Sequence, residues 1–222
     1  MTIQKKLKKI IHIVYIDDFF PELFEITFPN IKSYAERYGY EINLITERKF
    51  PEWHVHYEKM QVYEAGKDAD INVLLDADIL IHPGYPDVIN LVPIFCVGFN
   101  QAYNLSSKCR VNGYFVRDGR DVGIASNFVV STYLTHDLWK PLPITPEEGR
   151  KITFVREGDI DEYCLSYNFA KYGLHYTGLA WTEWMQEYIV HTGTSHREYA
   201  VELARKTAHE WSLLRPQNGY DF

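Results

Sequence analysis

An apolar run that ends in two closely spaced carboxylates places the strongest constraint on the fold of this chain. Residues 71–75 have the sequence INVLL and lead directly into Asp76, Ala77 and Asp78. A short apolar run of this kind is typical of a strand buried in a parallel sheet. Carboxylates that follow such a strand lie at the edge of the sheet where open α/β folds bind ligands. The run therefore predicts an α/β fold with a polar site beside this strand.

The spacing of the two carboxylates suits a divalent metal ion. Side chains alternate along an extended chain, so Asp76 and Asp78 are expected to face the same side. Two hard oxygen ligands favour Mg²⁺ or Mn²⁺ carrying a phosphate-rich substrate. The pattern Asp-x-Asp also occurs at residues 68–70 and 159–161, but only the pair at 76–78 follows an apolar strand.

The composition excludes several classes of protein. A hydrophobic fraction of 46% over 222 residues is enough for a full core. The net charge of −7 argues against a nucleic-acid-binding protein, which needs a basic surface. The apolar residues 10–16 are too few to span a bilayer and lack a cleavage site, so neither a transmembrane segment nor a signal peptide is expected. The basic run at 5–9 is interpreted as a solvated leader, and three widely separated cysteines fit a reducing, cytoplasmic location.

The periodicity of the apolar residues predicts strands that alternate with helices. Strands are expected at 10–16, 40–45, 71–75, 94–98 and 128–131, and helices at 23–38, 57–66 and 195–214. Gly39 is expected to stop the first helix, which Pro29 should kink or divide. The last helix is expected to bury four residues at helical spacing: Tyr199, Leu203, Thr207 and Trp211. Such alternation implies right-handed crossovers and a parallel sheet with helices on its faces.

The order of these elements, ending in VLLDADILIHPG, resembles the GT-A glycosyltransferases, a family of nucleotide-sugar-dependent enzymes that includes glycogenin. Three further segments are similar to family elements: GIASNFVVS at 123–131, DIDEYCLSY at 159–167 and HTGTSHRE at 191–198. The resemblance implies the α/β GT-A fold, which has a Rossmann-like, mostly parallel central sheet with helices on both faces. A single domain at 1–222 is expected, with a nucleotide-binding half at about 8–98 and an acceptor-binding half at about 99–222. Transferases of some large DNA viruses and bacteria are also similar, which would place a viral protein in the host cytoplasm.

The resemblance also implies roles for particular residues. Asp76, Asp78 and His191 would bind the metal ion, and Asp76 would alternatively contact the donor ribose. The donor nucleotide sugar would be bound by these and by further residues: Tyr15, Asp17, Lys59, Asn127, Gly193 and Arg197. The competing interpretations are core packing for Tyr15, a solvated helix face for Lys59 and a hydrogen-bonded strand-end histidine for His191.

The acidic segment at 159–162 supplies the candidate catalytic residues, Asp161 and Glu162. A carboxylate there would deprotonate the acceptor hydroxyl in an inverting enzyme, or stabilise or attack the sugar cation in a retaining one. Alternatively, the segment only caps the helix that follows it.

Together these residues predict a metal-dependent glycosyltransferase. It would use Mn²⁺ or Mg²⁺ to move a sugar from a UDP-sugar to a hydroxyl of a glycan or glycoprotein. One alternative is a non-catalytic module that binds glycans or sugar nucleotides with the same fold. Another is a phosphatase of the haloacid dehalogenase type, although that motif usually follows the first strand. A sugar-nucleotide pyrophosphorylase needs a glycine-rich loop after the first strand, and residues 17–25 contain no glycine.

Overall fold

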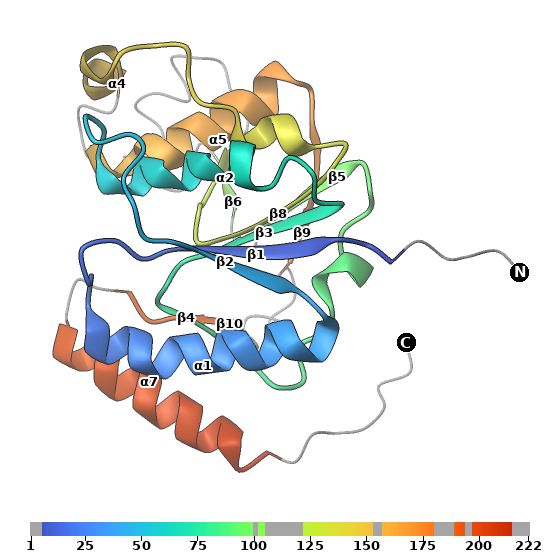
Figure 1. Cartoon of the computed structure of the whole chain (residues 1–222), viewed down its shortest axis with the longest axis vertical. Helices are drawn as coiled ribbons and strands as arrows, with labels where there is room; N and C mark the ends of the chain where they lie inside the picture. The colour runs from blue at the N-terminus through green and yellow to red at the C-terminus, as the bar shows by residue number, and fades with distance from the viewer. Residues whose placement is uncertain are drawn as a thin grey trace, which may run out of the picture.

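The computed structural model describes residues 6–99, 102–104, 122–152, 157–179, 189–193 and 197–214. A central sheet lies between two layers of helices (Figure 1). The strands are β1 (Lys9–Val14), β2 (Glu41–Ile45), β3 (Ile71–Leu75), β4 (Ile79–Ile81), β5 (Cys96–Phe99), β6 (Ala102–Asn104), β7 (Val122–Ile124), β8 (Phe128–Thr132), β9 (His175–Gly178) and β10 (Ile189–His191). The α-helices are α1 (Pro21–Tyr38), α2 (Val62–Ala65), α4 (Pro146–Ile152), α5 (Ile160–Lys171) and α7 (Arg197–Ser212). The 3₁₀ helices are η1 (Val55–Gln61), η2 (Val88–Asn90), η3 (His136–Trp139) and η4 (Glu157–Asp159).

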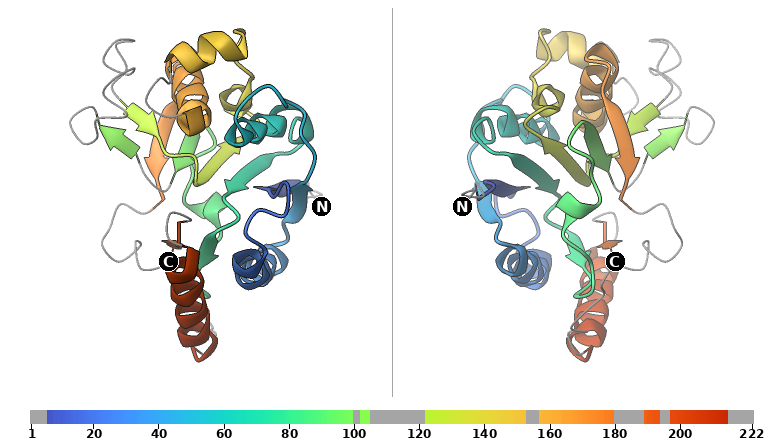
Figure 2. Two further views of the ribbon diagram at one scale, coloured as in Figure 1. Left: turned by 90° about the vertical axis from the view of Figure 1, so that its left-hand side faces the viewer. Right: turned by 90° about the vertical axis from the view of Figure 1, so that its right-hand side faces the viewer.

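The central sheet has the strand order β2-β1-β3-β8-β5-β9. All neighbouring pairs are parallel except the two that involve β8, which runs antiparallel to both β3 and β5. Helix α1 lies on one face of this sheet with α7 packed beside it, and α2 and α5 lie on the other face with α4 farther out on the same side (Figure 1 and Figure 2). The predicted fold class, a mostly parallel sheet with helices on both faces, is confirmed. The sequence predicted the position of β8 but not its reversed direction.

The first helix forms largely as the sequence predicts. Pro21 stands at its first position, and Gly39 ends it with φ of +70° and an N–H bond to the carbonyl of Ala35. The expected division at Pro29 is wrong, because α1 is assigned as one helix through this residue. Proline removes only one backbone hydrogen bond, and the buried residues Leu23 and Ile31 hold the helix against the sheet on either side.

One polar face of α1 holds the backbone that follows β3. The Thr27 hydroxyl bonds to the carbonyl of Ala77. The Asn30 amide donates to the Ile81 carbonyl at 2.9 Å and accepts from its N–H at 2.7 Å. Further along the helix, Tyr34 and Tyr38 donate to backbone carbonyls at residues 86 and 85. The chain from 77 to 86 is therefore positioned by the side chains of a helix far from it in sequence.

Two expected helices differ from the prediction. The segment predicted as a helix at 57–66 is the 3₁₀ helix η1 followed by the single-turn α2. In α7, Tyr199 is 63% exposed, which contradicts its expected burial, and the buried residues are Ala200, Ala204 and Thr207. Small side chains occupy this face because α7 packs closely against α1. The predicted start of this helix at Ser195 lies outside the described residues. None of the described helices combines the length and apolarity needed to cross a bilayer.

Candidate active site

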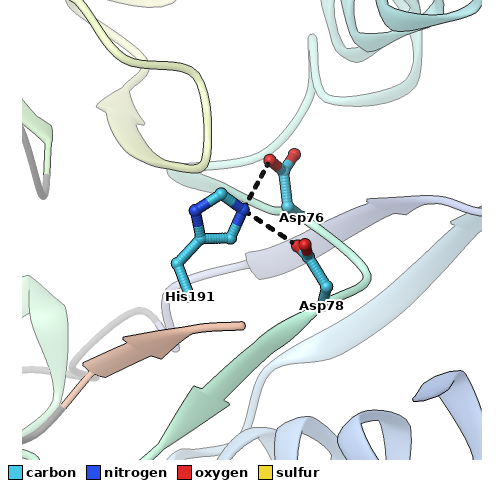
Figure 3. Close-up of side chains that lie close together, drawn as sticks. All are labelled: Asp76, Asp78 and His191. Atoms are coloured by element: carbon cyan, nitrogen blue, oxygen red, sulfur yellow. Dashed lines mark ion pairs between the residues drawn. The ribbon is translucent and has the colours of Figure 1, made fainter. Parts of the chain in front are cut away.

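Three predicted metal ligands converge at the end of β3. One ligand atom from each of Asp76, Asp78 and His191 lies within 4.8 Å of the others (Figure 3). The Nε2 atom of His191 is 3.2 Å from Asp78 Oδ1 and 3.9 Å from Asp76 Oδ2. A separate two-stranded sheet explains this convergence, because β10 pairs antiparallel with β4 and sets His191 opposite Ile79. Two carboxylates and an imidazole in this arrangement suit a divalent cation.

Backbone and hydroxyl hydrogen bonds fix the segment that carries the carboxylates. The N–H and the hydroxyl of Thr192 both donate to the Asp78 carbonyl at 3.1 Å, which joins the His191 segment directly to Asp78. The Asp76 N–H donates to the Asn127 carbonyl at 2.9 Å. These hydrogen bonds fix the backbone of Asp76, Asp78 and His191, as expected for a preorganised set of metal ligands.

The two carboxylates make His191 more basic. Burial alone would lower the pKa of its imidazole, but the hydrogen bond to Asp78 and the charges of Asp78 and Asp76 outweigh burial and raise it. A metal ion binds only the neutral imidazole, so metal binding would release the proton that the neighbouring carboxylates stabilise on His191. Metal affinity is therefore expected to weaken as the pH falls.

Lys59 links Asp76, a predicted metal ligand, to Asp161 in the predicted catalytic segment. Its ammonium lies 2.7 Å from Asp76 Oδ1 and 2.9 Å from Asp161 Oδ2, and it donates to the Ser126 hydroxyl at 2.8 Å. The side chain is only 7% exposed. Burial alone would lower the pKa of Lys59, but the charges of Asp161 and Asp76 raise it, so the ammonium stays charged. The interpretation of Lys59 as a solvated helix residue is therefore wrong.

Asp161 is buried at the start of α5, at 1% exposure. Its Oδ2 atom accepts hydrogen bonds from Lys59 and from the Ser126 hydroxyl. Burial alone would raise the pKa of this carboxyl, but the charges of Lys59 and His56 and these hydrogen bonds lower it. Within the described part of the chain, Asp161 Oδ1 and the buried Asn127 Oδ1 have no hydrogen-bond partner. Unsatisfied buried acceptors require an explanation, and a ligand that brings hydroxyl donors supplies one.

A pocket of about 240 Å³ opens beside these residues. Lys59, Asp76 and Asp78 line its polar side, and Asp17 and His56 also line it. Its apolar wall comes from the end of β1, the start of α1 and η1: Val14, Ile16, Phe19, Phe20, Leu23, Phe24 and Val55. A cavity with an apolar wall next to carboxylates and a lysine suits a ligand with a flat ring at one end and charged groups at the other.

The other predicted donor-binding residues are not part of the lining of this pocket. Tyr15 stacks on Phe24 with ring centroids 3.9 Å apart and does not line the pocket itself. The Arg197 guanidinium lies 5.1 Å from the ring centroid of Phe20, outside the pocket lining. Gly193 has φ of +69°, the left-handed region that glycine adopts readily.

The remaining predicted catalytic residue, Glu162, lies in the first turn of α5 beside Asp161 and is partly buried. The sequence interpretation missed Ser126, which bridges Lys59 and Asp161, and His56 in the pocket wall. A signal for His56 was present, because it stands three residues before Lys59 and shares its helix face.

The sheet order, the single reversed strand and the Asp-x-Asp motif at the end of β3 define the GT-A glycosyltransferase fold. Among solved structures, a glycosyltransferase involved in the glycosylation of the major capsid of PBCV-1 is similar. It is 12% identical, has a TM-score of 0.59, and the match covers 89% of this chain and 99% of that chain. No protein-family model matches the sequence, and no curated protein matches it.

Two further structures share the architecture. The galactosyltransferase LgtC, solved with donor and acceptor sugar analogues, is 10% identical with a TM-score of 0.50, over 93% of this chain and 97% of that chain. A Drosophila β-1,4-galactosyltransferase 7 mutant, solved with manganese, UDP-galactose and xylobiose, is 11% identical with a TM-score of 0.50, over 86% and 74%. At these identities the likeness establishes the fold.

Proposed function

We propose that this protein is a metal-dependent glycosyltransferase that moves a sugar from a UDP-sugar to a hydroxyl of a glycan or glycoprotein. The observation that carries the proposal is the convergence of Asp76, Asp78 and His191 beside a pocket that also contains Lys59. A solved structure of the same fold contains manganese and UDP-galactose, which supports the choice of metal and donor.

In this proposal, residues 8–98 supply most of the donor site. Asp76, Asp78 and His191 hold Mn²⁺ or Mg²⁺, which as a Lewis acid stabilises the charge that builds on the departing diphosphate. The apolar wall of the pocket and Asp17 receive the nucleoside. Arg197 and the backbone at Gly193 lie on the segment that follows His191, and they provide further contacts for phosphate oxygens.

The sugar is proposed to contact the buried acceptors near Lys59. Hydroxyl groups of a sugar donate hydrogen bonds, and Asp161 Oδ1 and Asn127 Oδ1 are acceptors in need of donors. The Asp161 carboxylate stays ionised because Lys59 and Ser126 stabilise its charge. Its negative charge would stabilise the positive charge that develops at the anomeric carbon. Glu162 remains the second candidate for this role.

Titration calorimetry of UDP, with Mn²⁺ and with EDTA, tests the metal site. UDP affinity should fall sharply with EDTA, with Asp78→Ala and with His191→Ala. The two substitutions should be non-additive because both remove ligands from one ion. His175→Ala is the matched control, since this exposed histidine lies at the start of β9. Equal UDP affinity with Mn²⁺ and with EDTA would overturn the metal proposal.

A non-catalytic module would bind UDP in the same way, so a second measurement is needed. Release of UDP that depends on an added hydroxyl acceptor identifies a transferase. Binding of the UDP-sugar without any acceptor-dependent release, across a panel of glycans, would instead favour the non-catalytic module.

A further inference from the structure

The 3₁₀ geometry of η1 places a second side chain beside Lys59. Residues three apart eclipse one another in a 3₁₀ helix, about 6 Å apart along its axis. His56 and Lys59 have this spacing, and both line the same pocket as Asp76 and Asp78. His56 therefore faces the cavity in which the metal-binding carboxylates and Lys59 meet.

Two contacts orient the His56 ring. Its Nδ1 atom lies 2.7 Å from the carbonyl oxygen of Gly158, and because a carbonyl only accepts, Nδ1 must carry the hydrogen. In the neutral ring this leaves the lone pair on Nε2. On another side, the ring of His54 packs edge-to-face against it at 4.5 Å between centroids. His54 Nδ1 also accepts a hydrogen bond from the His56 backbone N–H. The ring is thus anchored through Nδ1, and in its neutral form Nε2 carries the lone pair.

Of the other charged groups of this region, Asp161, Lys59, Asp76 and Asp78 are already engaged or assigned to the metal ion, whereas Asp17 lines the pocket beyond the end of β1. Asp161 is engaged by Lys59 and Ser126, which stabilise its ionised form and weaken it as a base. Lys59 is a cation held between two carboxylates, and Asp76 and Asp78 would be bound to the metal ion. An imidazole changes protonation near neutral pH, which suits it to general base catalysis.

We propose that His56 Nε2 accepts the proton of the acceptor hydroxyl during sugar transfer. The O–H bond of the acceptor breaks, and its electron pair forms the new bond to the anomeric carbon. The bond from that carbon to the diphosphate breaks, and the electron pair leaves with the diphosphate. The proton ends on Nε2. This inference rests on the proposed transferase function and names the base that the function requires.

His56→Asn is the most direct test, because the shorter amide retains a donor for the Gly158 carbonyl and lacks the basic nitrogen. The turnover number should fall by about 10²–10⁴-fold, the usual contribution of a general base. With Mn²⁺ kept saturating at each pH, so that the pH dependence of metal binding at His191 does not contribute, the acid limb of the pH–rate profile should weaken in the variant. UDP affinity in the presence of Mn²⁺ should fall far less than turnover, because His56 is only one of the residues that line the pocket proposed for the donor.

An acceptor with an acidic hydroxyl, such as a nitrophenol, distinguishes a base from a structural residue. Such an acceptor needs little help with deprotonation, so the variant should recover most of the wild-type rate with it. His56→Gln provides a second variant should His56→Asn fold poorly, and His175→Gln is the control, because this exposed histidine of β9 lies outside the pocket lining. An unchanged acid limb, or an equal loss with both acceptors, would overturn the assignment. A wild-type protein that transfers to neither acceptor would overturn the proposed function instead.

Discussion

Replacement of Lys59 by methionine tests whether the buried charge cluster is as tightly coupled as its distances indicate. Lys59 is the cation shared by Asp76 and Asp161, and Asp161 is buried with its Oδ2 atom 2.9 Å from the ammonium. Methionine fills a similar volume but leaves the Asp161 charge without a counter-ion. Removal of one partner of a buried ion pair destabilises proteins by about 3–5 kcal/mol. For a chain of this size, such a loss lowers the melting temperature by roughly 6–20 °C.

The double variant makes the reasoning specific to the ion pair. Asp161→Asn removes the uncompensated charge, so Lys59→Met with Asp161→Asn should be clearly more stable than Lys59→Met alone. Acidification should also reduce the stability difference between Lys59→Met and the wild-type protein. A buried carboxyl without its cation has a raised pKa, so Asp161 in this variant becomes neutral as the pH falls.

The free energies of unfolding are measured by urea titration, followed by circular dichroism at pH 7 and at pH 5. The four proteins compared are the wild type, Lys59→Met, Asp161→Asn and the double variant. The slope of each transition shows whether two-state comparison is valid. A loss below about 1 kcal/mol for Lys59→Met would place the pair in the range of solvent-screened surface ion pairs. No recovery in the double variant would likewise refute the coupling.

Three further predictions concern catalysis, pH and packing. Asp161→Asn should reduce turnover by about 10²–10³-fold with nearly unchanged UDP affinity, because the charge proposed to stabilise the anomeric carbon is lost; if Glu162→Gln is inactive and Asp161→Asn is active, the roles are reversed. Burial lowers the pKa of His12 to about 4, so the unfolded chain takes up this proton first as the pH falls. Stability should therefore decline between about pH 6.5 and pH 4 by up to about 3 kcal/mol, and His12→Gln should lack this decline in urea titrations. Gly66→Ala would bring a Cβ atom within 2.1 Å of Asn72 Oδ1, and calorimetry should detect a loss of about 1–3 kcal/mol; an unchanged melting temperature would contradict this packing.

The fold was largely predictable because its signals are local. The apolar run of β3 and the Gly39 stop of α1 each depend on residues that are neighbours in sequence. The reversed direction of β8 was not predictable from its sequence, since a buried apolar strand has the same composition in either direction. The 3₁₀ geometry of η1 was also missed, because residues 57–66 fit an α-helix equally well by apolar spacing.

The site was predictable only in part because it depends on pairing between distant segments. Asp76 and Asp78 follow from the strand pattern, whereas His191 was singled out through the family resemblance. Its approach to Asp78 requires the pairing of β10 with β4, and β4 was not predicted as a strand. Lys59 has an ordinary sequence context, and its importance arises from burial between two carboxylates. Such burial is a property of the folded chain.

The backbone path of residues 77–86 depends on side chains of α1 and less on the side chains within the segment itself. Four α1 side chains form hydrogen bonds to backbone carbonyls of that segment: Thr27, Asn30, Tyr34 and Tyr38. Because these bonds do not involve the side chains of the segment, many different side chains there are compatible with the same backbone conformation. A saturation scan should therefore tolerate changes at the exposed position 84 while rejecting nonpolar residues at Thr27 and Asn30. The amide hydrogen of Ile81, bound by Asn30, should exchange slowly with solvent although β4 is only three residues long. In this protein, side chains of α1 therefore determine the backbone path of residues 77–86, which include Asp78.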